Sequence, residues 1–412
     1  MADQKKVKTC RICGGKSFHK YLDLGDQPPS NSFVFKKNQR EKKYSLKVIL
    51  CKKCYLSQLD TVVSHRKIFD KYLYLSSTSS ALVKHYTKLV NNICLRFKVK
   101  EYDNIFDIGC NDGITLNCYK KKYKNIYGIE PSTAGKIAKK RGFKIIKNFF
   151  NFSLSNKIKK KIGLAKIITA TNVFAHVDNL KDFTKGVKCL LDPNEGVFII
   201  EFPYIFEMLK DLYFDTIYHE HLSYLSITPL NLLFDQFDLK IFDIKKTNIG
   251  ASGPGLRVYV SSKNSKYKIT KNVKFFINFE KKMKINDVRI YDDFSKKIKK
   301  IKFDINKMIK SLIKKGFKIG AFGAPAKGNT LLNYLELKSN KICAIAENND
   351  LKINTYAPGS KIKIISDHDF LKLKCNYALL LSWNYIDFFK KNSIFYKRGG
   401  KFILPFPKLR II

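Results

Sequence analysis

Two short segments combine residue types that could hold a nucleoside. Residues 104–113 read NIFDIGCNDG, an apolar run that ends in an acidic, glycine-rich turn, and residues 126–130 read IYGIE, ending at Glu130. Glycine lets the backbone approach a ligand closely, and a carboxylate at the end of the next strand can accept ribose hydroxyls. The turn lacks the third glycine that dinucleotide-binding loops use. The pattern therefore favours a nucleoside without phosphates, such as S-adenosylmethionine, over an ordinary strand–turn–helix with a chance acid.

The segment 214–226, FDTIYHEHLSYLS, gathers groups that could do acid–base chemistry. A histidine oriented by a carboxylate is a competent general base near neutral pH, and a tyrosine can hold an enolate oxygen. Tyr218, Glu220 and His221 supply these types within four residues. A polar surface loop is one alternative. Metal binding by His219 and His221 is a weaker one, because no third ligand is obvious nearby.

Four of the ten cysteines form two C-x-x-C pairs, Cys10 with Cys13 and Cys51 with Cys54. In a chain without secretion signals, such cysteines favour metal or free thiols over disulfides. Two pairs of this kind suit tetrahedral Zn²⁺ bound by four thiolates. Four thiolates leave no position for water, so we expect a structural metal. The alternative is two unrelated cysteine pairs.

The chain's size and charge limit the classes of protein that fit. With 412 residues, of which 45% are hydrophobic, it can form two to four domains. It has no run of 18 apolar residues and no apolar signal segment, so we expect a cytoplasmic protein without a membrane partner. The net charge of +45 would suit nucleic acid. However, the lysines are spread along the whole chain together with Ile, Asn, Phe and Tyr, as AT-rich codon usage would produce. We expect no specific nucleic-acid partner, and an anionic small substrate would benefit equally.

The elements that would position these residues follow an α/β pattern. In residues 71–90, tyrosines and serines precede a helical pattern, and a linker is the simplest interpretation. From residue 91 to about 225, strand candidates alternate with helical patterns, as in a doubly wound sheet. The strand candidates are 105–108, 126–129, 144–146, 165–169 and 196–201. In such sheets ligands lie at the carboxyl ends of strands. Polar residues at or just beyond these ends are Asn111, Glu130, Asn148, Asn172, His176 and Glu201.

The remainder of the chain indicates a less regular insert, a helix and a second α/β unit. The insert and helix occupy residues 226–315, and apolar residues from Phe294 to Leu312 recur with helical spacing. The turn GAPAKGN then resembles a phosphate-binding loop, but Asn329 stands where lysine is needed. Nucleotide hydrolysis is therefore rejected, although an anion could bind there, and Lys327 is a candidate substrate-binding residue. The predicted elements of this unit are strands 318–322, 342–345, 377–381 and 401–404 and a helix at 330–337.

Taken in order, four motifs carry a family resemblance: C-x-x-C…C-x-x-C, D-I-G-x-N-D-G, Y-H-E-H-x-S-Y and GAPAKGNTLLN. The second is shared by class I S-adenosylmethionine-dependent methyltransferases, and the last two in this order are specific. The chain resembles the nucleotide-sugar C-methyltransferases, which act on TDP-linked 4-keto-deoxysugars. The resemblance covers nearly the whole chain. It implies a zinc-binding domain at 1–70, a class I methyltransferase domain with an insert at 71–300, and a C-terminal Rossmann-like domain at 301–412 that helps to hold the substrate.

The resemblance also implies roles for individual residues. His221 would take the proton from the carbon beside the ketone, and the enolate carbon would attack the methyl group of S-adenosylmethionine. Arg257 would bind the substrate phosphate, although the preceding loop IGASGPG differs from the G-G-S-x-R of many relatives. Residues that would assist are Glu220, Tyr218, His176 and a tyrosine of KYLYLSS, either Tyr72 or, preferably, Tyr74. The expected cofactor-binding residues are Asp107, Gly109, Asn111, Asp112, Gly113, Glu130, Asn148 and Asn172.

Two other classes of function stay open on the sequence alone. An RNA methyltransferase with a zinc module would suit the charge, but the lysines are scattered and no aromatic–basic recognition patch stands out. A non-catalytic protein that binds S-adenosylmethionine or a nucleotide would retain the fold without the chemistry. The intact turn, Glu130 and the YHEH cluster argue against it.

Overall fold

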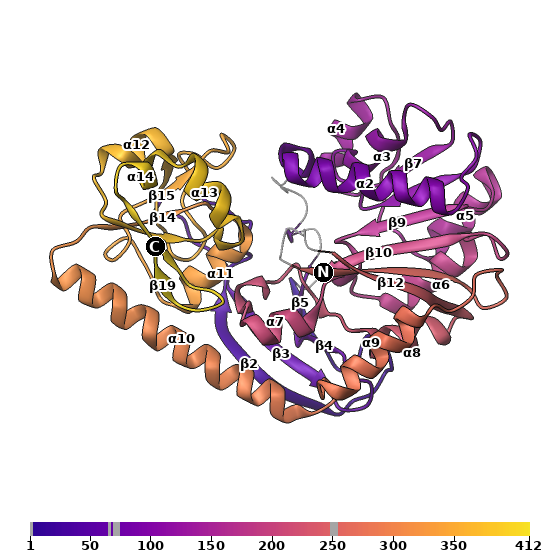
Figure 1. Cartoon of the computed structure of the whole chain (residues 1–412), viewed down its shortest axis with the longest axis horizontal. Helices are drawn as coiled ribbons and strands as arrows, with labels where there is room; N and C mark the ends of the chain where they lie inside the picture. Colours follow the sequence, from indigo (N-terminus) through magenta and orange to yellow (C-terminus); the bar gives the residue numbers. More distant parts are fainter. Residues whose placement is uncertain (1–2, 65–66, 69–74, 248–253) are drawn as a thin grey trace.

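The computed structural model describes residues 3–64, 67–68, 75–247 and 254–412, which form four sheets (Figure 1). Two of them are large α/β sheets, a seven-stranded one in the middle of the chain and a six-stranded one at its C-terminal end. The N-terminal module contacts both. Its strand β4 pairs with a strand of the central unit, and its Ser30 accepts a hydrogen bond from Asn329 of the C-terminal unit. The α/β class is the one that the sequence predicts.

The N-terminal module is a small antiparallel structure. Strand β2 pairs with β3 and β3 with β4, while β1 and β5 form a separate pair. Their bounds are β1 Gln4–Lys6, β2 Phe18–Gln27, β3 Tyr44–Cys51, β4 Ser57–Leu59 and β5 Thr61–Val63. A fourth strand, β11 (Ser223–Tyr224), joins the sheet beside β4 from far along the chain. Because β11 directly follows the histidine-rich segment, this sheet ties that segment to the cysteine module.

The central sheet has the order β12-β13-β10-β9-β6-β7-β8. Its first five strands in the chain are parallel, and β13 runs antiparallel between β10 and β12. The bounds are β6 Ile105–Ile108, β7 Ile126–Ile129, β8 Lys144–Ile146, β9 Ile167–Thr171, β10 Val197–Pro203, β12 Leu239–Thr247 and β13 Gly255–Ser262. The first three agree with the sequence prediction, and the carboxyl ends of the next two lie two residues later than expected.

The expectation of an irregular insert after residue 226 is wrong for β12 and β13. These strands complete the central sheet, and every residue of β13 is buried. Sequence inspection missed them because Lys245 and Lys246 at the end of β12, and the polar residues of β13, mask the apolar alternation. The helical pattern seen within residues 71–90 is α2 (Ser80–Arg96), so the linker interpretation does not hold from residue 80 onward.

Alternate residues of the central strands pack into two separate cores. In β6, Ile105 faces one core and Phe106 the other, and in β9 Ile167 and Ile168 divide in the same way. Burial on both faces is typical of parallel sheets covered by helices. The helices of this unit are α2, α3 (Ile114–Tyr119), α4 (Ala134–Lys140), α5 (Phe152–Ile162), α6 (Leu180–Leu190), α7 (Ile205–Asp211), α8 (Ile227–Asp235) and α9 (Lys271–Lys282), with short 3₁₀ turns η1 (Ser76–Thr78), η2 (Phe174–His176) and η3 (Phe214–Thr216).

The long helix α10 (Val288–Lys314) joins the central and C-terminal units. Figure 1 shows it along the lower edge of the molecule, where it packs against β2. Its buried residues include Phe294, Ile298, Ile305 and Leu312, which agrees with the predicted helical spacing. The domain division expected between residues 300 and 301 falls inside this helix.

The C-terminal sheet has the order β16-β15-β14-β17-β18-β19, and only β19 is antiparallel to its neighbour. Strand β15 begins three residues later than predicted, and helix α11 begins four residues earlier, inside the GAPAKGN turn. The bounds are β14 Ile319–Phe322, α11 Ala326–Tyr334, β15 Ile345–Glu347, β16 Ile364–Ser366, α12 Asp367–Lys372, β17 Tyr377–Leu380, η4 Trp383–Tyr385, α13 Ile386–Asn392, α14 Ile394–Lys397, β18 Lys401–Leu404 and β19 Arg410–Ile411. None of the helices in the described ranges is long and apolar enough to span a membrane.

Candidate active site

A cavity of about 950 Å³ lies where the three parts of the chain meet. Its walls include the carboxyl ends of the central strands, the first turn of α11 in the C-terminal unit, and Asn31 of the N-terminal module. Its volume is at the upper end of the roughly 300–1,000 Å³ typical of small-molecule sites. One cavity therefore reaches both α/β sheets.

Gly109 and Glu130 shape the end of the cavity beside β6 and β7. Gly109 has φ +68°, and a Cβ there would lie 2.3 Å from Val173 Cγ2, so only glycine fits. Glu130 Oε2 accepts the amide hydrogen of Asn111 at 2.9 Å, and Oε1 accepts that of Ser132 at 2.8 Å. Each carboxylate oxygen can accept a further bond. Two ligand hydroxyls could therefore bind a carboxylate that the backbone already holds in place.

The cofactor-binding residues expected from the sequence divide into two groups. Five of them line the cavity, namely Gly109, Asn111, Glu130, Asn148 and Asn172. The other three are not among the lining residues: Asp107 lies in β6, and Asp112 and Gly113 belong to the turn that follows it. Asp112 is fully buried, accepts a hydrogen bond from the Ser77 hydroxyl and forms an ion pair with Arg141.

Asp107 lies within the central sheet, where its Oδ1 accepts the Thr169 hydroxyl at 2.5 Å. Burial raises the pKa of Asp107 to about 7, against the lowering effect of hydrogen bonds from Thr169 and Thr115. The residue therefore holds β6 to β9 beneath the cavity floor.

A tyrosine and two histidines cluster in another part of the cavity wall. Tyr218 and His221 are joined by a hydrogen bond of 2.8 Å between the phenol oxygen and Nε2, and His221 Nδ1 lies 2.7 Å from the Thr216 carbonyl oxygen. Because a carbonyl only accepts, Nδ1 carries the hydrogen, and Nε2 accepts the Tyr218 hydroxyl. Burial lowers the pKa of His221 to about 4. The His176 ring centroid lies 5.0 Å from that of His221, and all three residues line the cavity.

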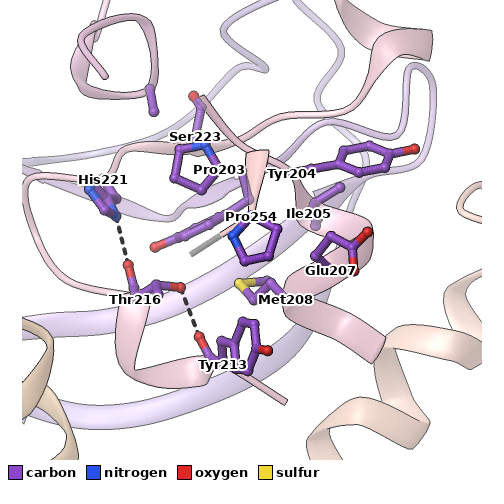
Figure 2. A pocket seen from close by; sticks show the side chains of 12 residues that line it. Pro203, Tyr204, Ile205, Glu207, Met208, Tyr213, Thr216, His221, Ser223 and Pro254 are labelled. Carbon is purple, nitrogen blue, oxygen red and sulfur yellow. Dashed lines mark hydrogen bonds between the residues drawn. The ribbon is translucent and has the colours of Figure 1, made fainter. Parts of the chain in front are cut away.

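Figure 2 shows the bond from His221 to Thr216 at the wall of a second, much smaller cavity of about 20 Å³. This space also contacts Ser223 and Tyr224, whose hydroxyl groups have no hydrogen-bond partner within the described structure. It is large enough for one water molecule. The small cavity therefore lies behind the imidazole and is too small for a substrate.

The neighbours of His221 in the sequence face different ways. His219 turns into the N-terminal module, where its Nε2 lies 3.1 Å from the Tyr44 carbonyl oxygen, and it does not line the large cavity. Glu220 does line it, and its Oε1 accepts the Asn31 amide at 2.6 Å. Sequence reasoning missed Asn31, whose only signal was its place in the turn-rich segment 22–33. Tyr72 and Tyr74 lie outside the described residues.

The two expected substrate-binding cations are placed differently. Lys327 is buried in the cavity wall, with Nζ 2.5 Å from Asn384 Oδ1 and 4.1 Å from the centre of the Trp383 ring. Burial lowers the pKa of Lys327 to about 8, opposed by the charge of Asp215. Arg257 is not a lining residue.

Arg257 is instead engaged in a buried ion pair within the central sheet. Its Nε lies 2.5 Å from Glu201 Oε1, and the other oxygen of Glu201 lies 2.7 Å from His85 Nε2. The sequence also missed Lys352, a cavity-lining residue whose ammonium group donates to the Ala324 carbonyl oxygen at 2.9 Å.

The four paired cysteines come together in the N-terminal module. Their sulfur atoms all lie within 4.8 Å of one another, with 3.5 Å between Cys10 and Cys54 and 3.4 Å between Cys13 and Cys51. Tetrahedral zinc with thiolate bonds of about 2.3 Å separates its sulfurs by about 3.8 Å, so the donor set fits Zn²⁺. Within the described ranges, these cysteines form the one group of potential ligands close enough to hold a metal. Binding by His219 and His221 has no such support.

Comparison with known proteins gives three family matches in succession. Residues 10–69 match the family described as "Putative zinc binding domain", residues 66–244 match "Methyltransferase domain", and residues 250–407 match "C-methyltransferase C-terminal domain". The C-methyltransferase NovU of Streptomyces niveus is 28% identical over 413 residues, covering 99% of this chain and 97% of NovU.

Two solved structures are similar to part of the chain. A S-adenosylmethionine-dependent methyltransferase from Clostridium acetobutylicum is 12% identical, with a TM-score of 0.34, and the match covers 44% of this chain and 92% of the other. Magnesium protoporphyrin IX methyltransferase from Synechocystis is 11% identical, with a TM-score of 0.33, and the match covers 47% and 86%.

The sheet order, the cysteine cluster and the successive family matches define a class I methyltransferase with an N-terminal zinc-binding module. The C-terminal segment matches a C-methyltransferase domain, and the chain is similar over its whole length to the C-methyltransferase NovU. The methyltransferase class, the zinc module and the family resemblance expected from the sequence are thereby confirmed.

Proposed function

We propose that this enzyme methylates a carbon of a nucleotide-linked keto-deoxysugar, with S-adenosylmethionine as the methyl donor and His221 as the general base. The observation that carries the proposal is the single cavity that contacts Glu130, His221 and Lys327. These residues would serve the nucleoside of the cofactor, the reacting carbon and the substrate phosphates. Their shared cavity supports a reaction between two ligands bound side by side.

At one end of the cavity, Glu130 and the turn at Gly109 would bind the cofactor. Glu130 would accept the two ribose hydroxyls, and the backbone at Gly109 would lie against the ligand without a side chain between them. Asn148 and Asn172, which also line this end, would contact the remaining polar groups. When bound, S-adenosylmethionine supplies an electrophilic methyl group on a sulfonium.

The hydrogen bonds of His221 suit this residue to act as the base. Thr216 holds Nδ1 protonated, which leaves Nε2 as the basic atom. When the substrate ketone enters, Tyr218 would turn its hydroxyl from Nε2 to the ketone oxygen. That exchange would free Nε2 to take the α-hydrogen, while Tyr218 stabilises the enolate oxygen. Glu220, His176 and a tyrosine of the segment 72–74 would complete the pocket around the sugar.

Two lysines in the cavity wall would bind the phosphates of the substrate. Lys327 is a buried cation at the start of α11, and Lys352 lines the same part of the cavity. Two ammonium groups beside a helix N-terminus favour an anionic ligand. The diphosphate of a nucleotide-sugar has the matching charge, and it would leave the keto-sugar directed toward His221.

The test is a turnover assay with ¹³C-methyl-labelled S-adenosylmethionine and a TDP-linked 4-keto-deoxysugar. We expect a product heavier by one methyl group, with the label on a carbon by NMR, and no product with His221→Asn. Labelling of RNA in place of the sugar would favour an RNA methyltransferase. Binding of both ligands without any transfer would favour a non-catalytic protein.

A further inference from the structure

The zinc-binding module contacts two segments of the active site from outside the cavity. The first contact is through strand β11, which begins two residues after His221 and pairs with β4, with Ser223 opposite Gln58 and Tyr224 opposite Ser57. Strand β4 itself begins three residues after Cys54. The chain therefore runs from His221 directly into β11, and β11 pairs with the strand that follows the cysteine pair Cys51 and Cys54.

A second contact joins the loop of His176 to the same sheet. The Leu222 amide donates to the Ala175 carbonyl oxygen at 2.9 Å, and the Leu59 amide donates to the Leu222 carbonyl oxygen at 3.0 Å. Leu222 therefore lies between the two histidine-bearing segments and the edge of β4. Among the described residues, no backbone hydrogen bond joins the N-terminal module to the far end of the His176 loop, residues 177–179.

The side chain of Arg11 contacts residue 178, at that end of the His176 loop. Arg11 lies inside the Cys10-x-x-Cys13 pair, and its side chain is only 3% exposed. Its Nη1 donates to Gln58 Oε1 at 2.9 Å and to the Leu59 carbonyl oxygen at 3.2 Å. Its Nε lies 3.5 Å from Oδ1 of Asp178, a cavity-lining residue two positions after His176.

A buried guanidinium needs a charged partner, because an unpaired buried charge is costly. Asp178 is the acid that the described structure places beside Arg11, and Lys5 forms a second ion pair with it near the surface. The ion pair therefore links Asp178, and with it the end of the His176 loop, to a side chain that lies between two zinc-ligand cysteines.

We propose that Arg11 is a positioning residue for methyl transfer, holding the His176 loop through Asp178 from within the zinc-binding cysteine pair. The proposal rests on the proposed function for its kinetic consequence. Arg11 does not line the cavity, so it would not contact a ligand bound there. Its effect is on the geometry of the reacting groups, where a displacement of about 1 Å can cost about 10²-fold in rate.

The test compares Arg11→Gln with Lys52→Gln, because Lys52 occupies the same position in the second cysteine pair but is exposed. For Arg11→Gln we expect kcat to fall on the order of 10²-fold, with zinc content, S-adenosylhomocysteine affinity and the KM for S-adenosylmethionine unchanged. Amide hydrogen exchange of residues 173–179 in the S-adenosylhomocysteine complex should become faster. Arg11→Lys should restore part of both losses, and Lys52→Gln should behave as the wild type.

Asp178→Asn tests the same pair from the cavity side, in case Arg11→Gln loses zinc or fails to fold. We expect the same kinetic and exchange changes, and no further loss in the double variant, because both substitutions remove one interaction. Wild-type kcat and wild-type exchange in Asp178→Asn would overturn the proposal. The exchange measurement needs no sugar substrate, so it decides on Arg11 even if the wild-type enzyme proves inactive on nucleotide-sugars.

Discussion

His221 combines a fixed tautomer with a low proton affinity. Thr216 holds the hydrogen on Nδ1, and burial lowers the pKa to about 4, so the imidazole is neutral near pH 7. A neutral base is ready to react, but a low pKa also makes it weak. The negative charge that develops on an adjacent enolate would offset this weakness, because a nearby anion favours the imidazolium. The buried site thus suits a base whose proton affinity rises during the reaction.

Glu130 is the residue on which the cofactor assignment depends most. Replacing Glu130 with Ala should weaken S-adenosylhomocysteine binding by roughly 2 kcal/mol or more, since two charge-assisted hydrogen bonds to ribose are lost. Titration calorimetry measures this directly. Glu101→Ala, at an exposed glutamate, serves as the control and should bind as the wild type. Unchanged affinity in Glu130→Ala would show that this carboxylate does not bind the ribose.

At this scale, the sequence predicted cavity residues that follow strands or lie in a recognisable motif, as Lys327 does, and missed residues in segments without such a motif. Glu130, Asn148 and Asn172 line the cavity because each follows a parallel strand, and strand ends are visible in a pattern of apolar runs. Asn31 and Lys352 line it as well, but no local pattern links either residue to the central sheet. Their positions depend on packing between units, which a single sequence does not encode locally.

Among the elements, β6 carries a buried acid with a marked pH dependence. The pKa of Asp107 is raised by burial to about 7, whereas in the unfolded chain it is about 3.9. Because this pKa is raised in the folded state, the contribution of Asp107 to stability is fully present below about pH 4 and is lost as pH rises through 7. The loss is at most roughly 4 kcal/mol, at about 1.4 kcal/mol per pH unit.

Asp107→Asn should remove this dependence, because an amide does not titrate. We expect the melting temperature of the variant, relative to the wild type, to rise by several degrees between pH 5 and pH 8, as thermal unfolding at each pH would show. Asp350→Asn, at an exposed aspartate, is the matched control. A difference between Asp107→Asn and the wild type that stays constant with pH would contradict the assigned pKa.

The cysteine module should contain one Zn²⁺ per chain, bound by Cys10, Cys13, Cys51 and Cys54. Native mass spectrometry or metal analysis measures this stoichiometry. Cys51→Ser should lose the metal and unfold at a lower temperature, since the zinc-bound state is linked to folding of the module. Cys189→Ser, at a cysteine outside the cluster, should keep it. A metal-free wild-type protein of full stability would argue against a zinc site.

Sequence inspection identified three strands of the central sheet with their bounds. Strands β6 and β7 have the predicted bounds because apolar runs between turn residues mark parallel strands, and the edge strand β8 has them although Lys144 is exposed. Strand β11 was missed because it has only two residues. It exists through pairing with β4, more than 160 residues earlier in the chain, and such pairing leaves no periodic pattern.

On the scale of the whole molecule, the cavity places a cofactor site on one α/β unit opposite a cation on the other. Lys327→Ala should raise the KM for the nucleotide-sugar by roughly 10-fold or more, because a hydrogen bond to a charged group is worth about 1.5–3 kcal/mol. Affinity for S-adenosylhomocysteine should not change. Steady-state kinetics would show this, with Lys338→Ala as an exposed control from the same unit. Equal KM values for Lys327→Ala and the wild type would place the phosphates elsewhere.

The central claim is that His221 removes a hydrogen from a substrate carbon, and deuterium exchange tests it most directly. The enzyme with S-adenosylhomocysteine and the keto-sugar in D₂O should exchange the α-hydrogen, seen as loss of its ¹H NMR signal. His221→Asn should keep S-adenosylhomocysteine binding but lower exchange and turnover by roughly 10²–10⁴-fold. His368→Asn, at an exposed histidine, should match the wild type. Wild-type exchange and turnover in His221→Asn, or a product methylated on oxygen, would contradict the mechanism.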